Sequence, residues 1–310
     1  MKNTAISFLK MMEMFPDAES ARKYIEGRRW PNGVICPYCN ESKPITIRKR
    51  AGFYRCNDCH EDFTVRTRTI FGRSHIPLHK WLLAMYLLVT ARKGISSMQL
   101  SKELGIGQTG AWFMLQRIRE ACGNDKSVLS GIVEVDEVYI GGKESNKHLY
   151  KRVNVHGKLD KKIPVVGMRE KEGRTKATIV QTTDSIALSK VVFENIEPGS
   201  TLHTDEYKSY RALDQDYKHE TVNHASGQYA HNGVSTNSIE SVWAVMKRGL
   251  HGVYHQVSKK HLARYISEFT FRLNDGNVTR TSMERLASLI DASFGKRLSY
   301  RTLVRGSISE

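Results

Sequence analysis

Two sets of residues in this 310-residue chain have the types and spacing that could do chemistry. The first is a set of four cysteines in two pairs, Cys36 with Cys39 and Cys56 with Cys59, spaced C-x2-C-x16-C-x2-C. Each pair places two thiolates at one tight turn, and two such turns close a tetrahedral site that suits Zn²⁺. Iron in the same four-sulfur geometry is the alternative. Because no coordination position stays open, the pattern predicts a structural metal.

The second set consists of acidic residues, and the first of them lies in an apolar stretch, Ile132–Tyr139, that predicts a β-strand. Alternation along the strand puts Glu134 and Asp136 on one face and Glu137 on the other. A carboxylate in such a strand is costly unless it is paired or bound to a metal. An edge strand with one wet face is the other explanation.

Two more acids follow at the ends of other expected elements. Asp205 comes directly after the predicted strand Thr201–Thr204, at the carboxyl end where α/β sheets place their chemistry; a helix N-cap is the alternative role. Glu240 lies in an amphipathic helix, three residues after Asn237, so the two could instead form a capping box. Lys247 lies two turns after Glu240 on the same face.

Together, Asp136, Asp205 and Glu240 could hold two Mg²⁺ ions about 4 Å apart. Hard divalent cations prefer oxygen ligands, and Mg²⁺ takes few protein carboxylates, which leaves room for water and phosphate oxygens. In such a site one ion activates the attacking hydroxyl and the other stabilises the leaving oxygen. The sequence therefore predicts a metal site that acts on phosphate groups.

The charge of the chain indicates a polyanionic partner. Lys and Arg number 48 against 32 Asp and Glu, so the net charge is +16, and the pI is about 9.6. This excess of positive charge favours nucleic acid as the partner. The alternative is that the positive charge serves only to keep the protein soluble. Two helical patterns, Ser96–Gly105 and Gln108–Arg119, match a helix-turn-helix with the turn at Gly105, and Gln108 and Thr109 would face base edges. A plain helical hairpin would give the same pattern.

The remaining elements set the fold class and the domains. Helical patterns flank the cysteines, whereas short β-branched runs interleaved with helices begin at Gly131, which predicts a mixed α/β domain. Three strands, a helix, a strand and a helix in that order favour a ribonuclease H-like mixed sheet with flanking helices. We expect N-terminal helices and a zinc ribbon in residues 1–70, a helix-turn-helix region in 75–125, and the catalytic domain in 128–310.

No segment predicts a membrane span or a signal peptide. The longest apolar run, Trp81–Val89, is far shorter than the ~18–20 residues that a bilayer requires, and Met1–Lys10 lacks an apolar signal core. We therefore expect a cytoplasmic protein with reduced cysteines, among which Cys122 is a small buried residue.

The chain resembles bacterial insertion-sequence transposases of the DDE type, in the branch with an N-terminal zinc ribbon and an ISXO2-like ribonuclease H-fold catalytic domain. Five stretches carry this resemblance: Arg29–Gly33 running into Cys36–Cys39, Val133–Glu137, His203–Tyr207, His231–Lys247, and Phe269–Asn274. They extend over nearly the whole chain, and only their combination is specific.

The resemblance implies a DNA transposase that binds inverted-repeat ends, cleaves phosphodiesters to free 3′-hydroxyls and joins them to target DNA. It places the catalytic triad on Asp136, Asp205 and Glu240, with Mg²⁺ (or Mn²⁺) as the catalytic metal, and gives Lys247 a phosphate contact. Some relatives use Asn as the third ligand, so Asn237 is a neighbour to consider. His231 also lies nearby in the sequence.

The resemblance and the charge pattern together imply double-stranded DNA as the partner, a homo-oligomer on DNA, and action at the bacterial nucleoid. The DNA contacts that we expect are Gln108, Thr109, Arg117, Lys151, Arg152, Lys161, Lys162 and Arg248. Four of these lie in a basic stretch between the first two strands, which could equally be a solvated hairpin loop. A non-catalytic DNA-binding regulator and a nuclease without strand transfer remain the alternative functions.

Overall fold

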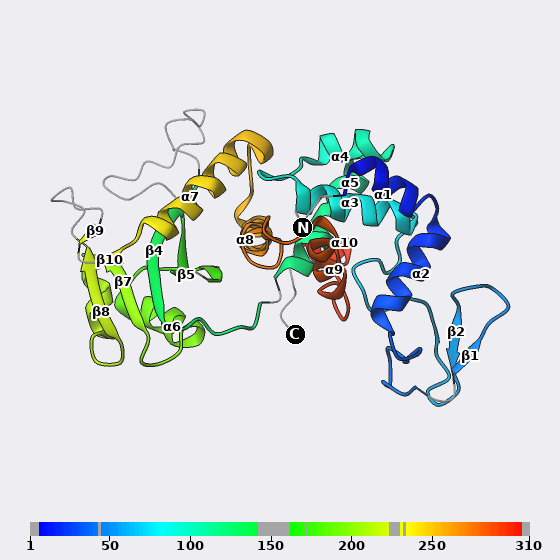
Figure 1. Cartoon of the computed structure of the whole chain (residues 1–310), viewed down its shortest axis with the longest axis horizontal. Coiled ribbons are helices and arrows are strands. Elements are labelled where there is room, and N and C mark those ends of the chain that lie inside the picture. The colour runs from blue at the N-terminus through cyan, green and yellow to red at the C-terminus, as the bar shows by residue number, and fades with distance from the viewer. Residues whose placement is uncertain are drawn as a thin grey trace. The chain divides into compact units, whose positions relative to one another are not determined.

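The computed structural model of the chain describes residues 6–42, 45–123, 125–141, 162–171, 173–222, 230–231 and 234–305 (Figure 1). It divides into two compact units, the first made of Met1–Asn124, Gly252–Tyr254 and Ser267–Glu310, and the second of Asp125–His251 and His255–Ile266. The domain boundaries expected from the sequence stay a proposal. They differ from the compact units, because residues 1–124 form a single unit and residues 252–254 and 267–310 pack with it.

The first unit is mostly helical, with a small antiparallel sheet in the order β1-β2-β3. Its elements are α1 (Phe8–Met14), α2 (Ala18–Arg29), β1 (Ile45–Ile47), β2 (Tyr54–Cys56), β3 (Asp62–Phe63), α3 (Leu78–Thr90), α4 (Ser97–Leu104), α5 (Gln108–Cys122), α9 (Ser282–Asp291) and α10 (Tyr300–Arg305). The helix α8 (Lys259–Leu273) begins among residues of the second unit and ends among those of the first. Within the described ranges, no helix is both long and apolar enough to span a bilayer.

Local signals explain where the helices of the first unit begin and end. Asp17 caps α2, because its side chain accepts a hydrogen bond from the Ser20 amide at 2.8 Å and the Ser20 hydroxyl lies 3.4 Å from the Asp17 amide. Ser96 caps α4, and Gly105 ends it in the left-handed conformation at φ +56°. Because α5 begins three residues later, the expected helix-turn-helix is present as two helices and a tight turn.

The C-terminal residues complete the core of the first unit. Glu268, which is fully buried on α8, forms an ion pair with Arg119 of α5 at 2.5 Å and a second one with Arg272. Burial alone would raise the pKa of Glu268, but the two guanidinium groups outweigh it and hold the pKa below its ordinary value. Leu286 and Leu289 of α9 belong to the same hydrophobic cluster as Trp81 of α3.

The second unit is an α/β domain built on a five-stranded sheet in the order β6-β5-β4-β7-β8. Its elements are β4 (Ile132–Ile140), β5 (Ile163–Glu170), β6 (Thr175–Ile179), α6 (Ser185–Asn195), β7 (Thr201–Asp205), a 3-10 helix (Lys208–Leu213), β8 (Lys218–Val222), β9 (Ala230–His231), β10 (Val234–Ser235) and α7 (Asn237–Gly249). A π-helical turn (Leu250–Tyr254) follows α7, and its residues Gly252–Tyr254 belong to the first unit. β4, β5 and β6 are antiparallel, whereas β7 and β8 run parallel to β4. This order confirms the ribonuclease H-like fold class.

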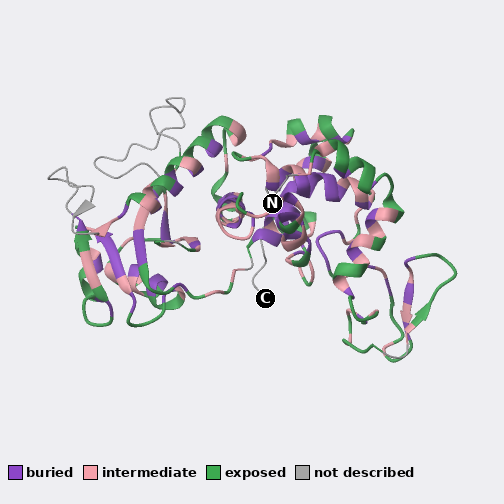
Figure 2. Ribbon diagram, in the orientation of Figure 1, coloured by how far each residue is buried: buried purple, intermediate pink, exposed green. Residues whose placement is uncertain are grey.

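The two faces of this sheet differ in what they bury. Val133 and Val135 of β4 belong to the hydrophobic cluster that α6 contributes to through Leu188 and Val192. The opposite face carries the side chains that alternate with them, and α7 lies against β4 and β5 on that face (Figures 1 and 2). The period of two along a strand therefore sends Glu134 and Asp136 toward α7.

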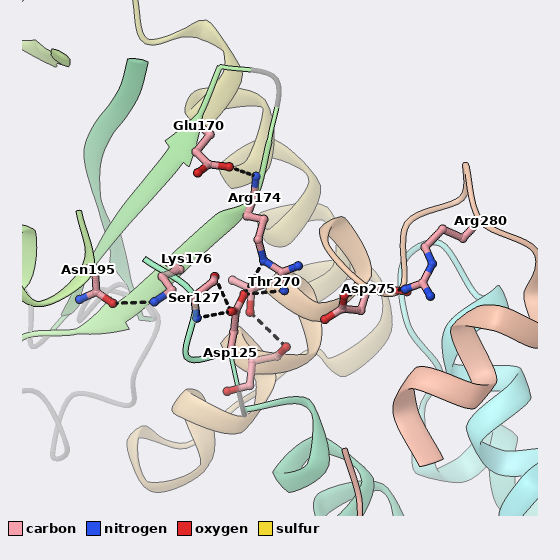
Figure 3. A network of polar contacts seen from close by, with 10 residues as sticks. Asp125, Ser127, Glu170, Arg174, Lys176, Asn195, Thr270, Asp275 and Arg280 are labelled. Atoms are coloured by element: carbon pink, nitrogen blue, oxygen red, sulfur yellow. Dashed lines mark hydrogen bonds and ion pairs between the residues drawn. The ribbon is translucent and has the colours of Figure 1, made fainter. Parts of the chain in front are cut away.

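Polar contacts hold the segment before β4, and the strand β6, in place (Figure 3). Asp125, just before β4, forms an ion pair with Arg174 at 2.8 Å and accepts a hydrogen bond from the Ser127 hydroxyl at 2.6 Å. On β6, the Lys176 ammonium donates to Asn195 of α6 at 3.2 Å. These contacts tie the segment before β4 to the β5–β6 connection, and they tie β6 to the covering helix.

Candidate active site and zinc centre

The four cysteines converge in the first unit. The Sγ atoms of Cys36 and Cys59 lie 3.6 Å apart, as do those of Cys39 and Cys56, and all four ligand atoms lie within 4.8 Å of one another. With Zn–S bonds of about 2.3 Å, tetrahedral sulfurs are about 3.8 Å apart, so the spacing fits zinc. In the described part of the chain, this is the one group of three or more metal-ligating side chains that gathers so closely.

Strand register brings Asp136 and Asp205 together in the second unit. β4 and β7 are parallel neighbours, with Ile132 opposite Thr201 and Glu134 opposite His203. The pairing ends there, and continuing the same register by two residues puts Asp136 level with Asp205. Adjacent strands are about 4.8 Å apart and both side chains leave the same face, so the two carboxylates are neighbours at the carboxyl end of β7.

Asp136 is held in a largely buried position under α7. Its carboxylate accepts hydrogen bonds from the Trp243 indole nitrogen at 3.0 Å and from the Glu137 amide at 2.8 Å. Gly167 of β5 lies opposite Asp136, and any Cβ there would collide with the Trp243 ring. Burial raises the pKa of Asp136 to about 6, and the negative charges of Asp205 and Glu240 add to this shift. Such like-charge repulsion is what a bound cation would relieve.

Glu240 enters the site from the first turn of α7. Its carboxylate accepts a hydrogen bond at 3.3 Å from the hydroxyl of Thr236, the residue that begins the helix. The capping box with Asn237 does not form, because the cap is Thr236, whose side chain makes no capping bond, and Asn237 is exposed. Asp205 is not a helix N-cap, because the 3-10 helix that follows is capped by Tyr207; its carboxylate instead accepts a hydrogen bond from the Tyr207 amide at 3.0 Å.

Glu134 is the residue that fixes α7 to the sheet. It is 2% exposed, and it accepts hydrogen bonds from the amides of Ser238 and Ile239, each at 2.9 Å, and from the Ser238 hydroxyl at 2.6 Å. These amides belong to the first turn of α7, where the helix dipole favours a negative charge. A residue 104 positions away thus supplies the cap that the helix lacks locally.

The same strand therefore carries Asp136 and anchors the helix that carries Glu240. Sequence reasoning placed Glu134 on the correct face but gave it no role beyond that. Its signal was the presence of two acids on one face of an apolar strand. Glu137 lies on the other face as expected, where burial raises its pKa to about 7.

Comparison with known proteins identifies the chain. A family model described as the ISXO2-like transposase domain matches residues 128–274, and one described as the transposase zinc-ribbon domain matches residues 16–62. The chain belongs to this transposase family. The matched ranges include the candidate acids and the cysteine cluster, so the expected family is confirmed, and the four cysteines are positioned for zinc binding in the zinc ribbon.

Two relatives of this transposase agree with that assignment. An uncharacterized protein in transposable element ISH50 of Halobacterium salinarum is 27% identical over 274 residues, which cover 84% of this chain and 92% of that protein. An uncharacterized transposase-like protein of Haemophilus influenzae is 28% identical over 116 residues, 37% of this chain and 92% of that protein. The crystal structure of the Mos1 strand transfer complex is similar over 70% of this chain and 79% of that one, at 14% identity and a TM-score of 0.29.

The residues that we expected to contact DNA differ in their exposure. Gln108 and Thr109 are exposed at the start of α5, and the Gln108 side chain donates to the Ser97 hydroxyl at 3.0 Å. Lys247 and Arg248 are exposed in the last turn of α7. Lys162 is half-buried before β5; Lys151, Arg152 and Lys161 lie outside the described residues, as does the side chain of His231.

Arg117 differs from its expected role. Only 5% of it is exposed; its guanidinium lies over the rings of Trp81 and Phe113 and donates a hydrogen bond to the Gly72 carbonyl. We expected Arg117 to contact DNA, but α5 is buried on several sides, and the Arg117 side chain packs between aromatic rings instead. We therefore leave Arg117 out of the proposed DNA-contacting set.

Replacing Glu134 should loosen α7. In Glu134→Ala the amides of Ser238 and Ile239 lose their buried acceptor, so we expect the free energy of unfolding of the second unit to fall by about 2–4 kcal/mol. Urea unfolding followed by circular dichroism measures this change. The exposed Glu194→Gln variant on α6 should change the free energy of unfolding by less than about 0.5 kcal/mol. Equal stability of Glu134→Ala and the parent would show that the cap contributes nothing.

Proposed function

We propose that this transposase binds the inverted-repeat ends of its insertion sequence, frees 3′-hydroxyls by hydrolysis and joins them to target DNA by two-metal-ion catalysis. One observation carries the proposal. β4 holds Asp136 beside Asp205, and through Glu134 it holds the helix that presents Glu240. These contacts, together with the influence of the Asp205 and Glu240 charges on Asp136, support a site in which the three carboxylates act together.

The residues present fit a magnesium site. Asp136, Asp205 and Glu240 would be the ligands. Burial is the main cause of the raised pKa of Asp136 and the charges of Asp205 and Glu240 add to it, so a bound cation would stabilise the charged form. Within the described residues, only the four cysteines gather as closely as the ligands of a bound ion, so the three carboxylates would have to draw together when the ions bind. When bound, the two ions would lower the pKa of the attacking hydroxyl and stabilise the leaving oxygen.

The reaction consists of two exchanges at phosphorus. In the first, a water oxygen forms a bond to phosphorus, the bond from phosphorus to the 3′-oxygen breaks, and that oxygen takes up a proton. In the second, the freed 3′-hydroxyl attacks a target phosphodiester and displaces the target's own 3′-oxygen. Each step forms one P–O bond and breaks one, so neither a nucleotide cofactor nor a covalent protein intermediate is needed.

The residues of the chain position these reactants. Trp243 and Gly167 keep the Asp136 carboxylate in one orientation, and the Glu134 cap keeps Glu240 above it. Lys247, exposed two turns along α7, would contact a DNA phosphate. The exposed start of α5, with Gln108 and Thr109, would enter the major groove of the element end. The partner is double-stranded DNA, met in the bacterial nucleoid, and joining two ends requires a homo-oligomer on DNA.

A strand-transfer assay tests this function. Linear DNA carrying the element's terminal repeat, with its 3′-hydroxyl already exposed, is incubated with the protein, a supercoiled target and Mg²⁺. We expect joined products that are resolved on agarose gels and absent with EDTA. Cleavage of uncut ends without joining of pre-cut ends would instead indicate a nuclease. Sequence-specific binding with neither reaction would indicate a regulator.

A further inference from the structure

A groove of about 940 Å³ in the first unit is lined by arginine side chains. Its walls are the N-terminal end of α2, the tip of the β1–β2 hairpin, the zinc knuckle at Tyr38 and the segment 64–74. Six arginines face it: Arg22, Arg50, Arg66, Arg68, Arg73 and Arg297. Glu19 is the one acidic residue among the described lining residues.

Most of this positive charge is uncompensated. Arg22 is neutralised by Glu19 and Glu26 of its own helix. In the part of the chain that the structure describes, the other five arginines form no ion pair with a carboxylate. The positive charges of Arg66 and Arg297 also add to burial in lowering the pKa of Arg117 to about 10. Like charges held this close favour binding of an anion.

The segment 64–74 is built to present these side chains. Val65, Ile70 and Phe71 are fully buried and anchor it, and a series of tight turns runs between them, such as that from the Thr69 amide to the Arg66 carbonyl at 3.2 Å. Arg68 and Arg73 are exposed and adopt left-handed backbone conformations, at φ +53° and +54°, which are unfavourable for a residue with a Cβ. The turns thus send basic side chains outward between buried anchors.

Neighbouring groups hold several of the guanidiniums in place. Arg66 donates to the carbonyl of Ser74 at 2.7 Å. Arg68 donates to the Pro37 carbonyl of the zinc knuckle at 2.9 Å and lies 5.0 Å from the centre of the Tyr38 ring. Arg50 lies over the Phe53 ring at the hairpin tip. Such ordered guanidiniums bind phosphate with less loss of side-chain entropy than free ones.

We infer that this arginine groove, defined by Arg50, Arg66, Arg68, Arg73 and Arg297, binds the phosphate backbone of duplex DNA next to the site that the helix-turn-helix reads. The inference rests on the proposed function, in which the first unit binds the element end. One guanidinium group can donate two parallel hydrogen bonds to one phosphate. Contacts to phosphates carry no sequence information. The groove therefore supplies affinity and register, whereas specificity comes from α5.

The test uses the full-length protein and a fluorescent 30-base-pair duplex of arbitrary sequence, followed by anisotropy as the salt concentration rises. Arg73 and Arg297 are exposed and donate no hydrogen bond within the described residues, so Arg73→Gln/Arg297→Gln should fold normally. If each arginine contacts one phosphate, the slope of log K against log salt should fall by about 2, and the affinity near 0.1 M salt by about ten- to a hundredfold.

A matched double variant, Lys10→Gln/Lys190→Gln, removes the same charge from exposed positions on α1 and α6 and should keep the parent slope. An unchanged slope in the groove variant would overturn the inference. Displacement of the labelled duplex by millimolar inorganic phosphate as complete as that by unlabelled duplex would also contradict the inference, because it would indicate a site for small anions. If strand transfer proceeds although the groove variant binds like the parent, the proposed function stands and only the groove is wrong.

Discussion

Asp136→Asn should lower both cleavage and strand transfer by about 10³-fold or more. Loss of one carboxylate ligand removes several kcal/mol of stabilisation from the charged transition state, and each 1.36 kcal/mol is a factor of ten in rate. The amide keeps the shape of the side chain and can still accept the hydrogen bond of Trp243. Rates are measured with pre-cut and uncut element ends at saturating Mg²⁺.

Stability and DNA binding distinguish a catalytic role of Asp136 from a structural one. Because burial and neighbouring acids raise the pKa of Asp136, the charged form is unfavourable in the metal-free fold. We therefore expect the asparagine variant to melt at the same temperature as the parent or higher, and to bind duplex DNA with unchanged affinity. Asp216→Asn, at an exposed position of the same unit, is the matched control and should keep full activity. A parallel loss of stability, binding and activity in Asp136→Asn would assign the residue a structural role.

Cys36→Ser should remove the metal from the zinc ribbon. The four sulfurs form a closed tetrahedral set, and a structural zinc contributes about 10–16 kcal/mol of apparent binding free energy, far more than the short strands β1 to β3 can supply. We expect zinc to fall from about one ion per chain to almost none by elemental analysis. The residues from Cys36 to Phe63 should become sensitive to protease, and binding of the element end should weaken.

Cys122→Ala provides the control for the zinc centre. Cys122 is buried at the end of α5, and its thiol donates to the Ile118 carbonyl at 3.5 Å, away from the cysteine cluster. This variant should keep a full complement of zinc. A parent protein that contains iron, or that contains no metal after purification without chelators, would show that the zinc assignment is wrong.

Short-range patterns were enough to predict much of the fold. The alternation in Ile132–Tyr139 gave both the strand and the correct faces for Glu134 and Asp136, because a strand needs no distant information to set its period. Ser96 and Gly105 marked the ends of α4 for the same reason. The packing of residues 267–310 with the N-terminal segments was not predictable, since it depends on contacts such as Arg119 with Glu268, which are 149 positions apart.

The candidate site also has features that the sequence predicted and features that depend on tertiary contacts. The spacing of the cysteines and the positions of the three acids are local or motif-based, so the sequence alone indicated them. The cap that Glu134 provides and the space that Gly167 leaves for Trp243 depend on which elements become neighbours. Arg117 shows the converse, because a helical pattern cannot tell an arginine that contacts DNA from one covered by aromatic rings.

The discontinuous first unit has a consequence for synthesis of the protein. Phe271 and Ile290 belong to the hydrophobic cluster shared by the N-terminal helices, so this cluster is incomplete until the ribosome has passed both residues. The α/β unit emerges before that point. A message that breaks or terminates early would therefore yield a first unit with an incomplete core, whereas the full-length chain can close it.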